Sequence, residues 1–194
     1  MAFPVLLDAC VLVPISLADL LLRLAEAGTY RPLWSAEVLD EVERNLPKLR
    51  VDAARARHRV SVMAAVFPDA EVTGHEDLIG TMTNDPKDRH VLAAAVRGDA
   101  AIIVTTNLRD FPAAALSPYD IDAVSPDGFL LDQLDLYPDT TLRCMGDLVA
   151  AKQNPAETVE DWLARFERTA PRFVHEVRQL RHGHDFPVPE QKSG

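Results

Sequence analysis

The clearest structural pattern in the chain runs over residues 84–106, with the sequence NDPKDRHVLAAAVRGDAAIIVTT. Asp85 suits an N-cap, and Pro86 stands at the first helical position, where its missing N–H costs nothing. The apolar residues that follow predict a helix over residues 86–97. Residues 101–105 then form an apolar run without alternation, which is typical of parallel strands covered on both faces. The pattern therefore predicts a helix that leads into a buried parallel strand.

Strand and helix patterns alternate on both sides of this unit. Residues 4–7 predict a short buried strand that ends at Asp8, residues 71–73 predict another, and residues 121–124 predict an edge strand. Apolar residues at helical spacing predict three helices between the first two of these strands. These helices are expected to begin at Ser16, as an N-cap, near Ser35, and at Val51. Because strands alternate with helices, we predict an α/β fold, a three-layer α/β/α sandwich with a central parallel sheet.

The pattern changes after residue 125. Residues 126–181 show helical spacing only, interrupted by prolines. We therefore expect two units, an α/β domain over residues 1–125 and an all-helical C-terminal extension over residues 126–194. The tail after Gly183 is expected to be frayed.

Composition limits the classes of function. The chain has 194 residues, with 30 acidic against 20 basic side chains and a net charge of −10, which argues against a general nucleic-acid coat protein. No apolar run approaches the roughly 18 residues of a membrane span, and Asp8 interrupts the first apolar stretch, so neither a membrane segment nor a secretory signal is expected. Cys10 and Cys144 form neither a disulfide framework nor a zinc motif. We expect a cytoplasmic protein.

Acidic side chains gather at one edge of the predicted sheet. Asp8 follows the first strand, Asp88 stands at the start of the helix over residues 86–97, and Asp110 lies just beyond the strand over residues 101–105. Sites in parallel sheets form at the carboxyl ends of the strands. Several carboxylates there repel one another unless a cation lies between them, and Mg²⁺ or Mn²⁺ is the usual ion. Two such ions can activate a water molecule and stabilise the leaving oxygen of a phosphodiester.

Four segments of the chain carry a family resemblance. They are residues 5–9 (VLLDA), 35–46 (SAEVLDEVERNL), 84–95 (NDPKDRHVLAAA) and 104–111 (VTTNLRDF). In this order and spacing they resemble PIN-domain nucleases, and more narrowly the VapC-type toxins of type II toxin–antitoxin pairs, in a variant with a helical C-terminal extension. The resemblance implies a Mg²⁺- or Mn²⁺-dependent endoribonuclease that hydrolyses RNA phosphodiester bonds. It also implies a cognate antitoxin protein as inhibitor and a homodimer.

The resemblance assigns a role to each of five positions. Asp8 matches the first carboxylate and should bind the metal directly, Glu41 matches the second, and Asp88 matches the third. The fourth position is either Asn107 or Asp110. Asp110 is the expected charged ligand, and Asn107 would contribute a neutral amide oxygen or position a water molecule. The resemblance thus implies Asp8, Asp88 and Asp110 as metal ligands.

One position departs from the family. The family commonly has Asn or Ser two residues after its first Asp, and this chain has Cys10. A thiol is a poor hydrogen-bond donor and a poor ligand for Mg²⁺, so the sequence leaves open what orients Asp8. Thr105 and Thr106 are both candidates to orient a carboxylate by hydrogen bonding.

Several of these residues also have plain structural interpretations. Glu41 lies off the apolar face of its helix, so only the resemblance selects it from the neighbouring acids. Asp88 could be an acid favoured by the helix dipole, although Asp85 already supplies an N-cap. His90 is more readily explained as a structural histidine. The basic stretch over residues 44–59 either grips RNA phosphates or forms a solvated helical face.

Two other functions compete with the nuclease. A catalytically silent binding or regulatory module on the same fold is suggested by Cys10 and Asn107 at polar site positions. A phosphatase or nucleotidase with a similar acidic cluster is the second alternative. It is disfavoured because the Asp-x-Asp pattern of a nucleophilic aspartate is absent after Asp8, where Cys10 stands.

Overall fold

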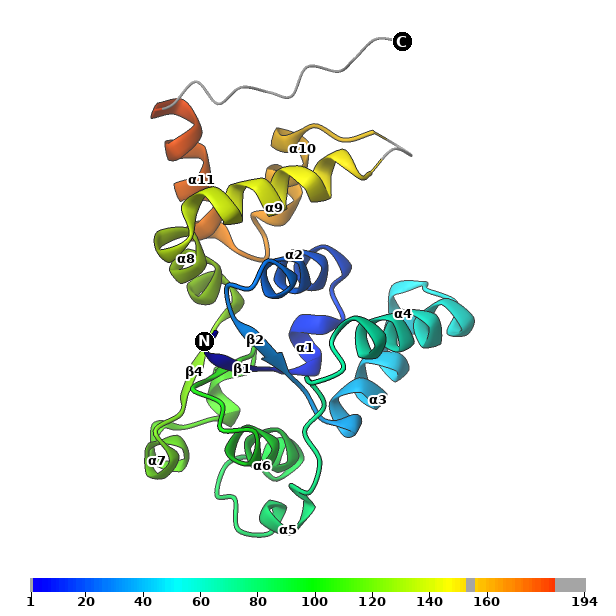
Figure 1. Cartoon of the computed structure of the whole chain (residues 1–194), viewed down its shortest axis with the longest axis vertical. Coiled ribbons are helices and arrows are strands. Elements are labelled where there is room, and N and C mark those ends of the chain that lie inside the picture. The colour runs from blue at the N-terminus through cyan, green and yellow to red at the C-terminus, as the bar shows by residue number, and fades with distance from the viewer. Residues whose placement is uncertain (1, 153–155, 184–194) are drawn as a thin grey trace.

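Four parallel strands form the central sheet of the protein, and the computed structural model describes residues 2–152 and 156–183 (Figure 1). The strands are β1 (Pro4–Leu7), β2 (Arg31–Leu33), β3 (Ile102–Val104) and β4 (Asp122–Val124), and their order in the sheet is β2-β1-β3-β4. The register places Leu6 between Leu33 and Ile103. Leu6 and Ile103 are fully buried, as the apolar runs around them predict for central strands.

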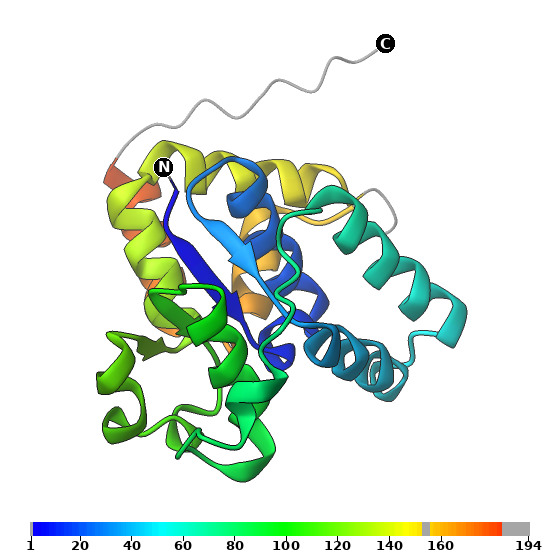
Figure 2. The ribbon, with the colours of Figure 1, turned by 60° about the horizontal axis from the view of Figure 1, so that its bottom comes forward.

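Helices cover both faces of this sheet. The helix α2 (Ile15–Glu26) lies on one face and α6 (Arg89–Arg97) on the other, above and below the strands in Figure 1, and Figure 2 shows the same arrangement turned. The prediction of a three-layer α/β/α sandwich is therefore confirmed. The other α-helices before the extension are α1 (Ala9–Leu12), α3 (Ala36–Asn45), α4 (Ala53–Val66), α5 (Glu76–Ile79) and α7 (Ala113–Leu116). Short 3-10 turns are η1 (Leu46–Leu49), η2 (Pro86–Asp88), η3 (Leu108–Asp110) and η4 (Ser117–Tyr119).

The C-terminal region is helical, as predicted. It contains α8 (Pro126–Leu136), α9 (Pro138–Ala150), α10 (Val159–Phe166) and α11 (Pro171–Gly183). These helices form a further layer over α2, with α9 packed directly against it (Figure 1). Phe129 of the extension meets the Tyr30 ring edge-to-face at a centroid distance of 5.0 Å. The Arg165 guanidinium donates a hydrogen bond of 2.7 Å to Ser16 Oγ.

The buried apolar side chains of both parts form one continuous core. The division into units over residues 1–125 and 126–194 therefore stays a prediction about folding. The tail expected to be frayed, from residue 184 onward, lies outside the described residues. Among the helices that are described, none is long and apolar enough to cross a membrane.

Three local predictions differ from the structure. The helix α2 has Pro14 at its N-cap, and Ser16 is already inside the first turn. The strand β2 was not predicted, because it contains Pro32, which interrupts a strand pattern. The structure accepts Pro32 because β2 lies at the edge of the sheet. The expected strand over residues 71–73 is reduced to a single bridge between Glu71 and Trp34.

Candidate active site

Asp8 lies where the chain leaves β1, and it is held in place by its neighbours. The residue is only 4% exposed. Its Oδ2 accepts hydrogen bonds from the Thr105 hydroxyl at 2.6 Å and from the Cys10 thiol at 3.1 Å. Its backbone N–H donates to the Val104 carbonyl at the end of β3, at 3.1 Å. Oδ1 accepts no hydrogen bond from any described residue, which leaves one carboxylate oxygen for a ligand.

Cys10 takes the orienting role that the sequence leaves open. Its Sγ accepts a hydrogen bond of 3.2 Å from the Thr106 N–H while its own proton points to Asp8. Burial, together with the Asp8 charge, raises the pKa of the Cys10 thiol to about 11, so the thiol stays protonated and can donate. Of the two candidate threonines, Thr105 is the one that contacts the carboxylate, and its Oγ1 also accepts from the Asn107 N–H at 3.0 Å.

A cavity of about 490 Å³ lies beside Asp8, at the carboxyl ends of the central strands. Its lining includes Asp8, Glu41, Asp88 and Asn107, four of the five predicted site residues. They come from the end of β1, from α3, from η2 and from the loop after β3. Lys48, from η1, lines the same cavity. The topology thus brings together residues that are far apart in sequence, as the carboxyl edge of a parallel sheet does.

Asp88 carries a charge that its surroundings balance only in part. Asp85 caps the turn by accepting a hydrogen bond from the Lys87 N–H at 3.1 Å, so the Asp88 side chain is not needed as a cap. The buried Oδ2 of Asp88 has no hydrogen-bond partner among the described residues. Burial, followed by the Asp8 charge, raises the pKa of Asp88 to about 7. Because the Asp8 charge disfavours the ionised form of Asp88, a cation at this cavity would stabilise the Asp88 carboxylate.

Asp110 lies close to Asp88 but is not part of the cavity lining. Its Oδ2 lies 3.1 Å from the Lys87 ammonium, which is 3.9 Å from Asp88 Oδ2. The hydrogen bond and charge of Asp110 raise the pKa of Lys87. Of the two candidates for the fourth position, Asn107 borders the cavity, whereas Asp110 adds negative charge beside Asp88. The sequence analysis did not predict that Lys87 would lie between Asp88 and Asp110. The position of Lys87 directly before Asp88 in the sequence was the signal that could have indicated it.

Glu41 is paired with a histidine across the site. Its Oε1 lies 3.4 Å from His90 Nε2, and one turn earlier in α3 Glu37 Oε2 lies 3.3 Å from the buried His75 Nε2. These are ion pairs whenever the histidines are protonated. The sequence analysis treated His90 as a structural residue, and its contact with Glu41 was missed because no local pattern links residues 49 positions apart.

Comparisons with known proteins agree with this geometry. The PIN domain family matches residues 4–109, which is more than half of the chain. The chain belongs to the PIN domain family. The family described as the VapC50 C-terminal domain matches residues 126–179. No solved structure matches the chain.

A curated relative of this PIN domain protein comes from Mycobacterium tuberculosis strain H37Rv and is named "Putative ribonuclease VapC50". The two are 50% identical over 107 residues, which cover 55% of this chain and 63% of the relative. The match thus spans less than two thirds of the relative's length.

The polar groups of this PIN domain suit a hard cation. Among the described residues, no three His, Cys, Asp and Glu side chains already stand in an arrangement that holds a metal ion. The free oxygen of Asp8, the unpartnered Oδ2 of Asp88 and the amide of Asn107 nevertheless border one cavity. Oxygen donors of this kind are those that Mg²⁺ and Mn²⁺ prefer. The donor set therefore fits the metal that the family resemblance implies.

Proposed function

We propose that this protein is a metal-dependent endoribonuclease that acts as the toxin of a toxin–antitoxin pair. The observation that carries the proposal is the meeting of Asp8 and Asp88 at one cavity, with a buried carboxylate oxygen that no described residue satisfies. The name of the curated relative, a ribonuclease, supports RNA as the substrate. The C-terminal family match supports the toxin variant with a helical extension.

Asp8 and Asp88 would hold the ion. Asp110, the third expected charged ligand, lies outside the cavity lining and would bind the ion only after leaving Lys87. A bound Mg²⁺ or Mn²⁺ supplies Lewis-acid stabilisation of the charge that develops on the phosphoryl group. Thr105 and Cys10 fix the rotamer of Asp8 so that its second oxygen stays available. Asn107 offers a neutral amide oxygen at the cavity.

Glu41, from α3, also lines the proposed site. Its carboxylate lies beside His90 of α6 and borders the cavity, where Glu41 would accept a proton from an attacking water molecule. No nucleophilic Ser or Cys with a paired base borders the cavity within the described ranges, and the thiol of Cys10 is held protonated. Direct hydrolysis by water is therefore the reaction that these side chains support.

The remaining parts of the proposal follow from the family. We propose a cognate antitoxin protein as inhibitor, a homodimer and a cytoplasmic location. We also propose that residues 1–125 form the nuclease unit and that residues 126–194 form the extension.

The decisive experiment is cleavage of a mixed pool of cellular RNA with Mn²⁺, Mg²⁺ or EDTA, with Asp8→Asn run beside the wild type. Asp122→Asn, which changes an exposed carboxylate on β4, is the matched control. Discrete fragments are expected that require metal, vanish with Asp8→Asn and persist with Asp122→Asn. Intact RNA in every lane from folded protein would overturn the proposal.

A catalytically silent module on the same fold remains the second candidate. The observations that favour it are the lack of a preformed ion site among the described residues and the neutral Cys10 and Asn107 at polar positions. Calorimetric titration with Mn²⁺ separates the two, because a silent module would show no binding at millimolar concentrations. A phosphatase has less support, since Asp8 is not followed by a second Asp at the spacing a nucleophilic aspartate requires.

A further inference from the structure

A basic segment lies beside the acidic cavity of a strongly acidic chain. Residues 44–59, here called the basic arm, contain six of the 20 Lys and Arg residues and one acid, Asp52. The arm comprises the end of α3, the turn η1 and the first half of α4. Against a net charge of −10 for the whole chain, this is a local reversal of sign.

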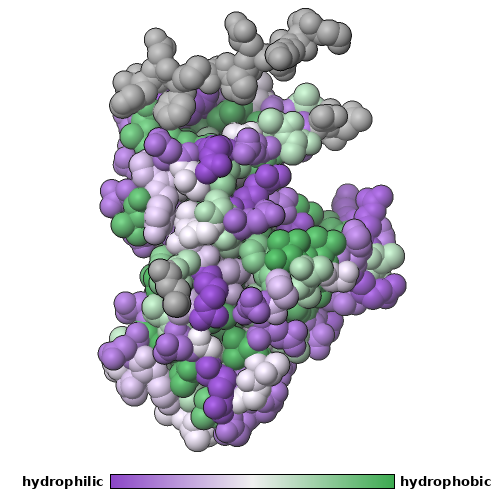
Figure 3. Space-filling view, viewed as in Figure 1, coloured by the Kyte–Doolittle hydropathy of each residue, from purple (hydrophilic) through white to green (hydrophobic). Residues whose placement is uncertain are grey.

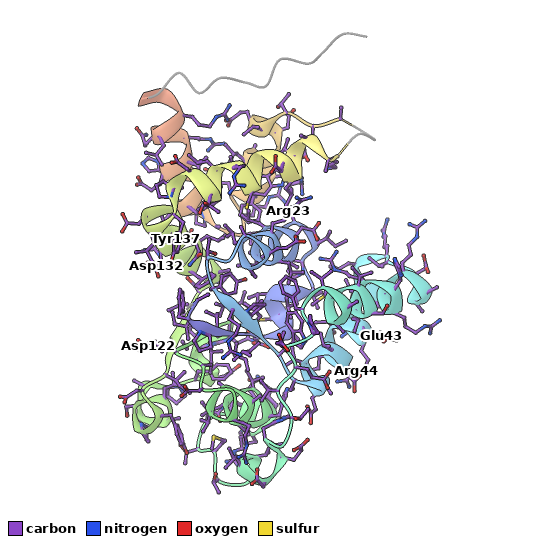
Figure 4. All side chains as sticks on the ribbon, in the orientation of Figure 1. Arg23, Glu43, Arg44, Asp122, Asp132 and Tyr137 are labelled. Carbon is purple, nitrogen blue, oxygen red and sulfur yellow. The ribbon has the colours of Figure 1, made fainter. Side chains whose placement is uncertain are left out.

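The basic arm projects from the body of the molecule. In Figures 1 and 2 α4 stands out to one side, and its packing partners include α3 and η1. Only Ala56 and Met63 of α4 are buried. The outer end of the arm is hydrophilic in Figure 3, and Figure 4 shows Arg44 near the end of α3. The arm is therefore open to a ligand along most of its length.

Most of the cations of the arm, four of six, have no acidic partner among the described residues. In the extension, Arg165, Arg172 and Arg178 all form ion pairs with nearby carboxylates. In the arm, only Arg55 and Arg59 do so, with Asp52 and Asp19. The exposed basic residues of the arm that form no ion pair with a described residue are Arg44, Lys48, Arg50 and Arg57.

The basic arm begins at the rim of the cavity. Asn45, Lys48 and Leu49 line it together with Asp8 and Asp88. The Lys48 ammonium donates a hydrogen bond of 2.7 Å to Asn45 Oδ1, which holds it on the arm's inner side. The carboxylates at this cavity repel a polyanion, and basic side chains at the cavity rim would offset that repulsion.

We propose that the basic arm binds the phosphates of an RNA strand and leads that strand into the cavity. This inference rests on the proposed function, because it assigns the surface that holds the substrate. Phosphates are favoured over an acidic protein surface because the outer end of the arm is hydrophilic, whereas protein interfaces have apolar centres from which charges are depleted. The exposed large apolar side chain of the arm, Leu49, lines the cavity instead. Unpaired, exposed Arg and Lys side chains are the usual phosphate contacts.

The test compares two charge-matched double variants. Arg50→Glu with Arg57→Glu alters the arm, and Arg143→Glu with Arg168→Glu alters two exposed arginines of the extension that form no ion pair with a described residue. Both variants change the net charge equally. Binding of a fluorescent 20-nucleotide uridine RNA is measured by anisotropy in EDTA, which prevents cleavage, over a range of salt concentrations. The arm variant is expected to lose about tenfold or more in affinity, and its log–log salt slope is expected to fall by about 1.4 if both phosphate contacts are lost.

The outcomes separate this inference from the proposed function. The proposal that the arm binds RNA is overturned if the arm variant and the wild type bind the RNA with equal affinity. It is also overturned if both double variants lose affinity equally. Metal-dependent cleavage that Asp8→Asn abolishes keeps the nuclease even if the arm variant binds normally. Arm-dependent binding without any cleavage keeps the arm and overturns the nuclease.

Discussion

At the scale of single residues, the site contains one carboxylate that is held by hydrogen bonds and one whose charged form is disfavoured by its surroundings. Asp8 is fixed by two donors, Thr105 and Cys10, so its free oxygen has a defined position. Asp88 has no such support and sits in a place where its charge is disfavoured. This contrast means that the metal-free protein stores unfavourable electrostatic energy at Asp88, which a bound cation would release.

Asp88 should therefore make the stability of the metal-free protein depend on pH. Its pKa is raised from 3.8 to about 7, so between these values the folded state binds more protons than the unfolded state. Stability falls as pH rises through this window and levels off above it. Asp88→Asn removes this loss, so its stability advantage over wild type should grow by about 2–3 kcal/mol from pH 5 to pH 8.

Urea unfolding in EDTA at the two pH values measures this difference. Asp122→Asn, at an exposed carboxylate, serves as the control and should show no comparable growth. A stability difference between Asp88→Asn and wild type that is the same at pH 5 and pH 8 would show that Asp88 is not strained in the folded protein.

The sequence identified the residues of the site better than their contacts. Asp8 and Asp88 could be predicted from their places at a strand end and a helix start, whereas Asn107 came from the family resemblance, and the structure puts all three at one cavity. Asp110, predicted from the same edge of the sheet, lies outside the cavity lining. The pairing of Glu41 with His90 could not be predicted, because it depends on how α3 packs near α6. The same holds for the thiol of Cys10, whose donor role depends on burial that a linear pattern does not encode.

At the scale of elements, the sequence predicted helices and strands correctly where neighbouring residues determine the conformation. The helix–strand unit over residues 84–106 appears as α6 and β3 because caps and apolar runs are local. The strand β2 was missed because Pro32 is tolerated only at the edge of a sheet, and edge position is a tertiary property. Ser16 was mistaken for an N-cap, and its hydroxyl instead accepts a hydrogen bond from Arg165 in the extension.

The junction between α6 and β3 supports a prediction about close packing. A Cβ at Gly98 would lie 2.8 Å from Leu33 Cδ1 and 2.9 Å from Val72 Cγ2, and both of those side chains are buried. Gly98→Ala should therefore destabilise the fold by about 1–3 kcal/mol through overpacking, despite the lower entropy of the unfolded chain. Chemical denaturation monitors the change.

Gly80→Ala provides the matched control for this substitution. A Cβ at Gly80 meets no atom within 4 Å, and its backbone is in the right-handed helical region. Gly80→Ala should therefore leave the free energy of unfolding unchanged or raise it by about 0.4–1 kcal/mol. Equal stability of Gly98→Ala and Gly80→Ala would mean that α6 can shift away from β2 at no cost.

At the scale of the whole molecule, the extension shares the core of the α/β part. Phe129 packs on Tyr30, whose hydroxyl in turn donates to the Leu21 carbonyl in α2 at 2.8 Å. Arg165 adds a polar contact to the same helix through Ser16. The extension thus covers a face of α2 that would otherwise meet solvent, which couples the stability of the two parts.

This coupling predicts a single cooperative unfolding transition. The chain has two tryptophans, both fully buried, with Trp34 beside the sheet and Trp162 in the extension. Trp34→Phe and Trp162→Phe leave one fluorescent reporter in each part, and the two reporters should give the same urea midpoint. Phe129→Ala, placed in both backgrounds, should lower both midpoints together by removing about 3–5 kcal/mol. Leu136→Ala, at a side chain that is 60% exposed, should leave them unchanged. If Phe129→Ala shifted the Trp162 signal alone, the extension would unfold independently, and the shared core would not couple it to the α/β part.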